Sequence, residues 1–415
     1  MKMKIGVLSL GCPRNLVDSE SLLGDLNLKG YSIVDINKAD VALINTCAFI
    51  EDARKESIEA ILDLIELKKS GNLKKIIVYG CLAQRYKDAL RKELPEVDAF
   101  VGKLTLNHSK SRFPITPRHF AYLKICEGCV NSCSFCIIPR IKGKLSSLPI
   151  DSILSKVKEF NREKISELNI IGQDITGFGL DLEKGVSLSG LILKIIKEAK
   201  NIGWIRLLYL NPERITSDLL NIIRDEPKIC KYIDLPIQHI NNRILKLMNR
   251  KTTKKEVIKL LKNIRQTIPS VKLRTSIIVG FPSETEKEFK ELLGFIKEVK
   301  FDRLGAFRYS REEGTRASRF KGQIPEKVKS ERLDQIMLAQ QDISRENNSK
   351  LLGKVLKVLI DEKDGNHYLG RTEFDAPEVD GLVYINSDKK LSCGEFIKAK
   401  ITDTLEYDLV GELKS

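Results

Sequence analysis

Six of the nine cysteines in this 415-residue chain fall into two triplets, and their placement constrains the fold more than any other feature. The first triplet is dispersed, with intervals of 35 and 34 residues, and consists of Cys12, Cys47 and Cys81. Each of these cysteines closes an apolar run typical of a buried strand, and each interval has about the length of one strand–helix–strand unit. Because parallel strands end at one edge of a sheet, the three thiols are expected to converge there.

The second triplet is local and has the spacing C-x-x-x-C-x-x-C, formed by Cys129, Cys133 and Cys136. An iron–sulfur cubane normally takes four cysteines. Two sets of three cysteines therefore predict two [4Fe-4S] clusters, each with one iron left open. An open iron favours chemistry at the cluster over simple electron storage.

The residues alone leave plainer alternatives open. Cys126 extends the local run to C-x-x-C-x-x-x-C-x-x-C, which suits a zinc knuckle or a ferredoxin-like site, although the order of gaps differs from the bacterial ferredoxin pattern. The dispersed cysteines could be three ordinary buried residues. We expect Cys126 to be a small buried hydrophobe, with a minor ligand role left open. Cys230 and Cys393 share no such context and are given no role.

The net charge of +15 is distributed unevenly along the chain. Residues 349–415 hold 10 Lys/Arg against 13 Asp/Glu, so a mildly acidic C-terminal part follows a strongly basic remainder. An odd number of cysteines without secretory context argues against a disulfide framework and indicates a reducing, cytoplasmic compartment. No apolar run approaches the ~20 residues that a membrane-spanning helix needs.

Alternating apolar runs and helical patterns predict an α/β protein with three folded parts. These are an N-terminal parallel-sheet α/β domain, a partial (βα)6 barrel and a small OB-like β-barrel made of five short strands. The predicted boundaries are 1–105 for the first domain, 106–119 for a linker, 120–325 for the barrel, 326–348 for a connector helix and 349–415 for the last domain.

The predicted barrel consists of six apolar runs separated by helices: Tyr122–Cys126, Leu168–Gly172, Ile205–Leu210, Tyr232–Ile237, Lys272–Gly280 and Arg303–Tyr309. Barrels of this kind place their ligands at the carboxyl ends of the strands. The local cysteine triplet directly follows the first run, as that rule requires. Residues at the ends of the other runs are candidates for cofactor contacts: Gln173, Asp174, Gln238, Ile277 and Gly280.

The segment Cys129-x-x-x-Cys133-x-Phe135-Cys136 is similar to the signature of radical S-adenosylmethionine enzymes. Together with the three upstream cysteines and the C-terminal β module, the whole chain resembles the methylthiotransferase family of that superfamily. Four segments are similar to the branch of this family called RimO: Leu8–Glu20, Phe135–Arg140, Asp234–His239 and Arg371–Gly381, the last within a module that resembles a TRAM domain.

The resemblance implies that both cysteine triplets hold [4Fe-4S] clusters and that S-adenosylmethionine binds the open iron at Cys129, Cys133 and Cys136. It implies a 5′-deoxyadenosyl radical that takes hydrogen from the β-carbon of an aspartate in small-subunit ribosomal protein twelve. The cluster at Cys12, Cys47 and Cys81 would carry the sulfur that is methylated and transferred. Phe135 joins the candidate cofactor contacts, and an external electron donor is required.

Two other functions stay open. One is a transfer-RNA adenosine methylthiotransferase, and the other is a non-catalytic iron–sulfur protein that docks on RNA or ribosomes. The acidic C-terminal part favours the RimO branch, because a module that grips RNA phosphates should be basic. We therefore expect one acidic loop to dock a basic protein partner, with the ribosomal protein or the assembling subunit as that partner: Asp375, Glu378 and Asp380.

Overall fold

The computed structural model describes residues 2–104, 111–365 and 367–414, which form two compact units. Unit 1 contains Met1–Thr116, Glu127–Ser146 and Ser310–Ser318, and unit 2 contains the rest of the chain. The predicted linker falls partly outside the described residues, since 106–110 are not among them. The first unit therefore gathers three stretches that are far apart in sequence.

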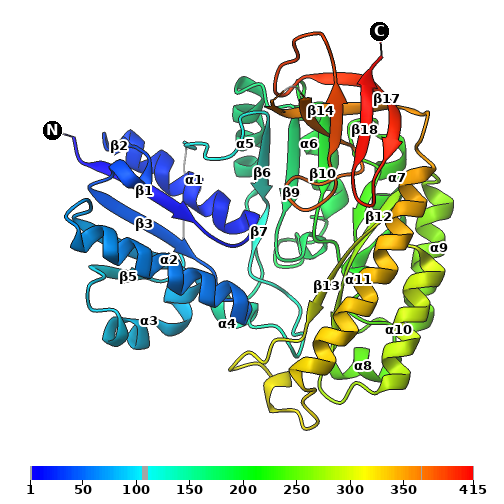
Figure 1. Cartoon of the computed structure of the whole chain (residues 1–415), viewed down its shortest axis with the longest axis horizontal. Coiled ribbons are helices and arrows are strands. Elements are labelled where there is room, and N and C mark those ends of the chain that lie inside the picture. Colours follow the sequence, from blue (N-terminus) through cyan, green and yellow to red (C-terminus); the bar gives the residue numbers. More distant parts are fainter. Residues whose placement is uncertain (1, 105–110, 366, 415) are drawn as a thin grey trace. The chain divides into compact units, whose positions relative to one another are not determined.

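Unit 1 is built on a five-stranded parallel sheet with the order β2-β1-β3-β4-β5. Figure 1 shows its strands in blue to cyan, with α1 and α2 beside them. The bounds of its elements are β1 Lys4–Ser9, α1 Pro13–Leu28, β2 Ser32–Ile33, β3 Val41–Thr46, α2 Glu51–Lys69, β4 Lys75–Gly80, α3 Cys81–Glu93, β5 Ala99–Val101 and α4 Ile138–Ile141.

The central strand β3 is buried along its whole length, because neighbouring strands and helices cover it on every side. Its residues Ala42 and Ile44 belong to a core cluster that also contains Ile61 of α2 and Leu82 of α3. Ile141 of the short helix α4 packs into the same cluster. The segment that carries the local cysteine triplet is thus anchored in the core of the N-terminal sheet.

Unit 2 contains six parallel strands, each lying where an apolar run predicts it. They form two three-stranded sheets, β10-β9-β6 and β11-β12-β13, and the backbone amide of Leu210 bonds the carbonyl of Asp234 (3.1 Å) beside their junction. The bounds are β6 Phe120–Lys124, β9 Glu167–Ile171, β10 Trp204–Leu207, β11 Tyr232–Asp234, β12 Lys272–Val279 and β13 Arg303–Arg308.

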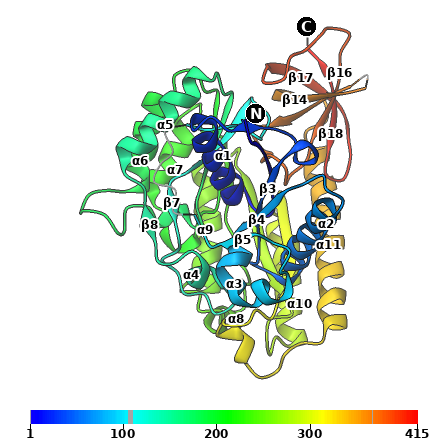
Figure 2. The same ribbon diagram turned by 90° about the vertical axis from the view of Figure 1, so that its left-hand side faces the viewer.

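Helices separate these strands and cover their outer side, as the greens of Figure 2 show for α5, α6 and α7. In α5 the buried residues Ile153, Val157 and Phe160 recur at helical spacing, which explains why this segment packs on the strands. The helix bounds are α5 Ile150–Arg162, α6 Leu188–Glu198, α7 Ser217–Asp225, α8 Asn242–Leu247, α9 Lys254–Thr267, α10 Glu286–Val299 and α11 Glu326–Ser349.

The C-terminal strands close into a small barrel with the order β14-β15-β16-β18-β17. Its interior holds alternating apolar residues, among them Val358, Ile360, Val383 and Ile401, as a closed barrel requires. The bounds are β14 Val355–Asp364, β15 His367–Thr372, β16 Val383–Asn386, β17 Phe396–Thr404 and β18 Leu409–Leu413. The predicted fold class is confirmed for all three parts. Within the described residues, no helix is both long and apolar enough to cross a membrane.

Candidate functional site

The dispersed cysteines meet at the carboxyl edge of the parallel sheet in unit 1. Cys12 caps the start of α1, Cys47 follows β3, and Cys81 begins α3 directly after β4. Besides burial, the charge of Cys12 raises the pKa of Cys47, and the charges of Cys47 and Cys12 raise the pKa of Cys81. The convergence that the strand spacing predicts is therefore present in the structure.

Two glycines allow the segments that carry the three cysteines to pack closely. Gly11, with φ +89°, precedes Cys12, and a Cβ atom there would lie 2.7 Å from Cys47 Cβ and 3.1 Å from its Sγ. Gly80, with φ +95°, precedes Cys81, and its Cβ would lie 2.3 Å from Asn45 Oδ1. Both positions lie in the left-handed region and leave no room for a side chain. The backbone is thus shaped around the three cysteines.

Buried amides support this edge, and sequence reasoning missed them. Asn15 is 1% exposed and donates to the carbonyls of Leu10 (3.0 Å) and Thr46 (3.3 Å), which ties the segments before Cys12 and Cys47 together. Asn45 in turn donates to the carbonyl of Asn15 (2.8 Å). The only sequence signal was the position of Asn15 inside the Leu8–Glu20 motif.

The electrostatics of the dispersed thiols are uneven. Burial opposes ionisation of Cys12, but Arg14 and the amides of Arg14 and Asn15 outweigh it and lower the pKa of the Cys12 thiol. Burial raises the pKa of Cys47, and it raises the pKa of Cys81 to about 12. Iron binding must therefore displace protons from these buried thiols, as thiolate ligation always does.

A buried lysine, Lys142, follows the local triplet in the sequence, and its charge partly offsets the rise that burial causes in the pKa of Cys81. The Nζ atom of Lys142, whose side chain is 5% exposed, lies 3.3 Å from Asp18 Oδ2 and 3.4 Å from Glu127 Oε1. Its charge favours the ionised form of Cys81 against burial. Lys142 stands at the end of α4, so one cation joins the segments of both triplets.

The local triplet lies in the loop before α4, and its three cysteines are half-buried. Asn131 donates its backbone N–H (3.4 Å) and its side-chain amide (3.5 Å) to Cys129 Sγ, and the Cys136 amide bonds the Cys133 carbonyl (3.2 Å). Burial, together with the nearby Cys133 and Cys129, raises the pKa of Cys136 to about 12. The loop thus holds three thiols together on one side and leaves them partly open.

Both donor sets fit iron–sulfur clusters. Each set has three cysteine thiols and no fourth. Amide groups of Asn131 bond a sulfur atom in the local set, and the amide of Asn15 bonds the backbone beside the dispersed set. Among the described residues, no three His, Cys, Asp or Glu side chains close on a single metal ion. A cubane presents a separate iron to each thiolate, so its ligands stand farther apart than those of one ion. Three thiols in each set match the three protein ligands of a cubane whose fourth iron is left open.

The other three cysteines belong to unit 2. Cys126 is fully buried, its Sγ faces the Asp174 carbonyl (3.9 Å), and a Cβ on Gly172 would lie 2.7 Å from that sulfur. Cys230 is buried in unit 2, and Cys393 is exposed. Cys126 thus packs as a small core residue, in agreement with the expectation for it.

The candidate cofactor contacts occupy different settings. Asp174 is buried and accepts bonds from Thr176, Asn211 (3.2 Å) and Arg214, so its carboxylate is already engaged. Gln238, with φ +69°, forms a parallel bridge with the fully buried Ile277, which brings these two together at the strand ends. Gln173 lies beside Asp174, and Phe135 is half-buried within the cysteine loop.

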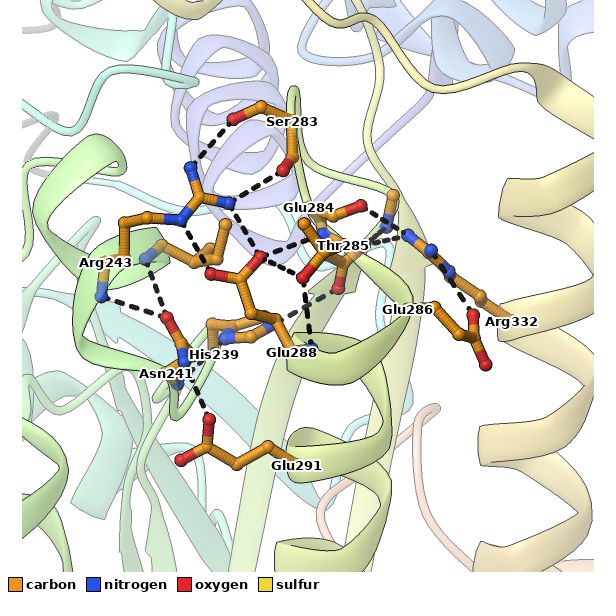
Figure 3. A network of polar contacts seen from close by, with 12 residues as sticks. His239, Asn241, Arg243, Ser283, Glu284, Thr285, Glu286, Glu288, Glu291 and Arg332 are labelled. Carbon is orange, nitrogen blue, oxygen red and sulfur yellow. Dashed lines mark hydrogen bonds and ion pairs between the residues drawn. The ribbon is translucent and has the colours of Figure 1, made fainter.

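A polar network around Gly280 was not foreseen. The Glu284 carboxylate, 2% exposed, accepts from the Gly280 amide and from Arg332 Nη1 (2.8 Å), and it faces His239 Nε2 at 3.1 Å. Figure 3 shows Glu284 between His239 and Arg332, with Arg243 and Glu288 beside it. The loop at the end of β12 is therefore fixed to α11 and to the end of β11.

The acidic loop lies only partly at the surface: Asp375 and the Asp380 side chain are buried within unit 2, whereas Glu378 is exposed, so the expected docking of a protein partner stays a prediction. Asp375 is 2% exposed and pairs with Arg303 of β13 (2.5 Å). The Asp380 side chain, also 2% exposed, accepts from Tyr232 of β11 (2.6 Å) and lies near Arg274. Glu378 is exposed as a residue, but its Oε2 accepts from Tyr122 of β6 (3.0 Å).

The loop closes the amino end of the partial barrel. Each of the six strands contributes one polar residue from its first three positions. Glu167 forms an ion pair with Arg371, and the other five contact residues 373–380 of the loop: Tyr122, Arg206, Tyr232, Arg274 and Arg303. A charge count alone could not separate this buried role from a docking role, because both need the same acidic residues.

Three family models match the chain in the order that the fold shows. Residues 4–102 match the family described as uncharacterized protein family UPF0004, residues 123–296 match the radical SAM superfamily, and residues 352–413 match the TRAM domain.

Among solved structures, the radical S-adenosylmethionine methyltransferase TsrM from Kitasatospora setae has a TM-score of 0.52, with 11% identity over 88% of this chain and 82% of that one. The cobalamin-dependent radical enzyme OxsB has the same TM-score with 13% identity, over 81% of this chain and 56% of that one. These likenesses concern the fold. The barrel, the cysteine loop after its first strand and the superfamily match together define a radical S-adenosylmethionine protein.

Curated relatives narrow this class. The ribosomal protein uS12 methylthiotransferase RimO of Clostridioides difficile (strain 630) is 46% identical over 99% of both chains. The RimO proteins of Thermoanaerobacter sp. (strain X514) and Geobacter sulfurreducens are 45% and 42% identical over 98% and 100% of this chain and 99% of theirs. The chain belongs to the RimO family of methylthiotransferases.

Proposed function

We propose that this protein transfers a methylthio group to the β-carbon of an aspartate in ribosomal protein uS12 by radical S-adenosylmethionine chemistry. The observation that carries the proposal is the pair of three-cysteine sites, one after the first barrel strand and one at the sheet edge. The names of the full-length relatives supply the substrate. The TRAM match adds contact with RNA as a coarser expectation.

Cys129, Cys133 and Cys136 would hold one [4Fe-4S] cluster, and Cys12, Cys47 and Cys81 would hold a second. When bound, the clusters and S-adenosylmethionine supply the radical and the sulfur chemistry. The protein supplies placement: Asn131 orients Cys129, Asn15 ties the segments before Cys12 and Cys47, and Lys142 compensates negative charge near Cys81. An external donor supplies the electron.

The candidate contacts for S-adenosylmethionine remain proposals at two strand ends. Gln238 and Ile277 form a backbone bridge, and the Glu284 carboxylate accepts from the Gly280 amide. These bonds fix the edge on which we propose that the nucleoside lies. The strained backbone of Gln238 agrees with this use, since such conformations gather at ligand sites. Gln173 and Asp174 after β9, and Phe135 in the cysteine loop, are further candidates for contacts to S-adenosylmethionine.

The test is a reaction of the reconstituted protein with S-adenosylmethionine, dithionite and either uS12 or transfer RNA, followed by mass analysis of both substrates. A methylthio group on one aspartate of uS12 supports the proposal. Modified adenosine in the transfer RNA assigns the other branch of the superfamily. Iron–sulfur protein that forms no 5′-deoxyadenosine under these conditions is a non-catalytic binding protein.

A further inference from the structure

Residues 310–318 follow β13 in the sequence but fold as part of unit 1, and we call them the strap. Their position matters because unit 1 also holds all six cysteines of the two sites. One end of the strap contacts the helices that follow Cys47 and Cys81, and the other end contacts the loop of the local triplet.

The first end is an ion pair beside Cys47 and Cys81. Glu312, whose side chain is 3% exposed, lies 2.6 Å from Arg85 Nη1 and 3.4 Å from Arg54 Nη1. Arg85 lies one turn after Cys81 on α3, so the two residues share a helix face. The same guanidinium donates to the carbonyl of Ala48 (2.9 Å), the residue after Cys47.

The strap backbone reinforces this end. Arg85 Nη2 donates to the carbonyl of Glu313 (2.9 Å), and the hydroxyl of Ser310 both donates to Glu312 (2.6 Å) and accepts from the amide of Glu51 at the start of α2. Glu312 and its exposed neighbour Glu313 therefore differ sharply. The buried carboxylate is bound by cations, whereas Glu313 contributes only its backbone carbonyl.

The other end of the strap holds the loop of the local triplet. The amide of Ala317 donates to the carbonyl of Ser134 (2.8 Å), and Arg316 donates to the carbonyl of Ser132 (3.0 Å), so both neighbours of Cys133 are bound. Gly314, with φ +85°, lies so close to α4 that a Cβ would stand 2.7 Å from Arg140 Nη1 and 3.4 Å from Ile137 Cδ1.

We propose that the strap fixes the two cysteine sites relative to each other and that Glu312 is its positioning residue. A carboxylate buried at this depth is tolerated only with its cations in place. Loss of the carboxylate charge would remove the ion pairs of Arg85 and Arg54 with the strap. Arg85 would keep only its bond to the Glu313 carbonyl there, and the segments of Cys47 and Cys81 would loosen. The consequence for the reaction rests on the proposed function, in which groups from both sites must meet one substrate carbon.

Misplacement of reacting groups by about 1 Å can cost roughly a hundredfold in rate. We therefore expect Glu312→Gln to lower the ratio of methylthiolated uS12 to 5′-deoxyadenosine by roughly that factor, while S-adenosylmethionine cleavage continues. Glu313→Gln is the matched control, because it changes the same functional group one residue away at an exposed position.

Two readouts do not depend on turnover. Hydrogen exchange of the reconstituted protein should accelerate in Glu312→Gln within residues 44–54 and also within residues 130–137, which Glu312 does not touch. The magnetic interaction between the reduced clusters should change in the same variant and stay as in the wild type in Glu313→Gln. A merely local structural role would change exchange only beside Glu312.

If Glu312→Gln does not fold, Arg316→Ala replaces it in the same experiments. This variant removes the bond to the Ser132 carbonyl at the other end of the strap, and Arg319→Ala, at another exposed position, is its control. The inference is overturned if Glu312→Gln matches Glu313→Gln in exchange, magnetic interaction and product ratio. The two proposals fail separately. A wild-type protein that leaves uS12 unmodified defeats the proposed function, while the exchange results still decide the role of the strap.

Discussion

Cys133 sits at the centre of the local site, with a strap contact on the carbonyl of each neighbouring residue. Backbone bonds on both sides of Cys133 hold the loop in place, and in the proposed function its thiol would be a cluster ligand. The same arrangement recurs at Cys12, where Gly11 and Asn15 shape the chain around the sulfur.

Cys133→Ala should abolish S-adenosylmethionine cleavage, because a cubane with only two thiolates does not hold a stable open iron. The measurement is the yield of 5′-deoxyadenosine from reconstituted protein. Cys393→Ala is the control, since Cys393 is exposed and lies in the C-terminal barrel segment, and it should keep the wild-type yield and iron content. A normal yield from Cys133→Ala would remove this cysteine from the site.

Asp375→Asn should destabilise the fold by about 3–5 kcal/mol, because it leaves the guanidinium of Arg303 buried without its counter-charge. Urea unfolding measures the change. Asp388→Asn, at an exposed position of the same domain, should lie within about 0.5 kcal/mol of the wild type. Equal stabilities of the two variants would return Asp375 to the role of a surface residue.

At the scale of elements, the strands can be predicted from the sequence. The six barrel runs and the five C-terminal runs all become strands, because apolar β-branched residues between turn signals need little tertiary information. The burial of Asp375 and Asp380 in the loop of residues 371–380 could not be predicted, since an acidic cluster reads the same whether it meets water or the buried ends of strands. Arg303 and Tyr232, its partners, carry no local sign of that contact.

The contact between β14 and the residue before β6 leads us to predict that fold stability depends on pH. Asp361 accepts from His119 (2.7 Å) and from Arg371 (2.7 and 2.9 Å). Burial opposes its ionisation, but both partners outweigh burial and hold the pKa of the Asp361 carboxyl below its usual range. A depressed folded-state pKa adds stability above the unfolded value of about 3.9, and that stability is lost as the pH falls through the folded value.

Asp361→Asn should therefore lose stability near neutral pH and show a flatter decline than the wild type below about pH 4. Urea unfolding at a series of pH values measures both effects. Asp364→Asn, exposed on the same strand, is the control and should follow the wild-type profile. A wild-type slope retained in Asp361→Asn would show that this carboxylate does not contribute to acid sensitivity.

At the scale of the whole molecule, residues 127–146 and 310–318 fall within the predicted barrel but pack in unit 1. The predicted boundaries put the two cysteine triplets in separate domains, but residues 127–146 pack with the N-terminal sheet, so unit 1 contains both. The sequence could not show this, because the helix α4 that anchors the loop is four residues long and its partner core ends at Phe100, far upstream in the sequence. The spacing of the cysteines is visible in the sequence, whereas their shared unit is not.

The triple variant Cys12→Ala, Cys47→Ala, Cys81→Ala tests the central claim, that two separate clusters divide the reaction between them. Because both sites share one unit, folding of the variant must first be verified by its unfolding transition. The measurement is the pair of product yields, 5′-deoxyadenosine and methylthiolated uS12, together with iron content. We predict about half of the wild-type iron, continued 5′-deoxyadenosine formation and no methylthio transfer. Unchanged iron, or methylthio transfer by the folded variant, would contradict the account.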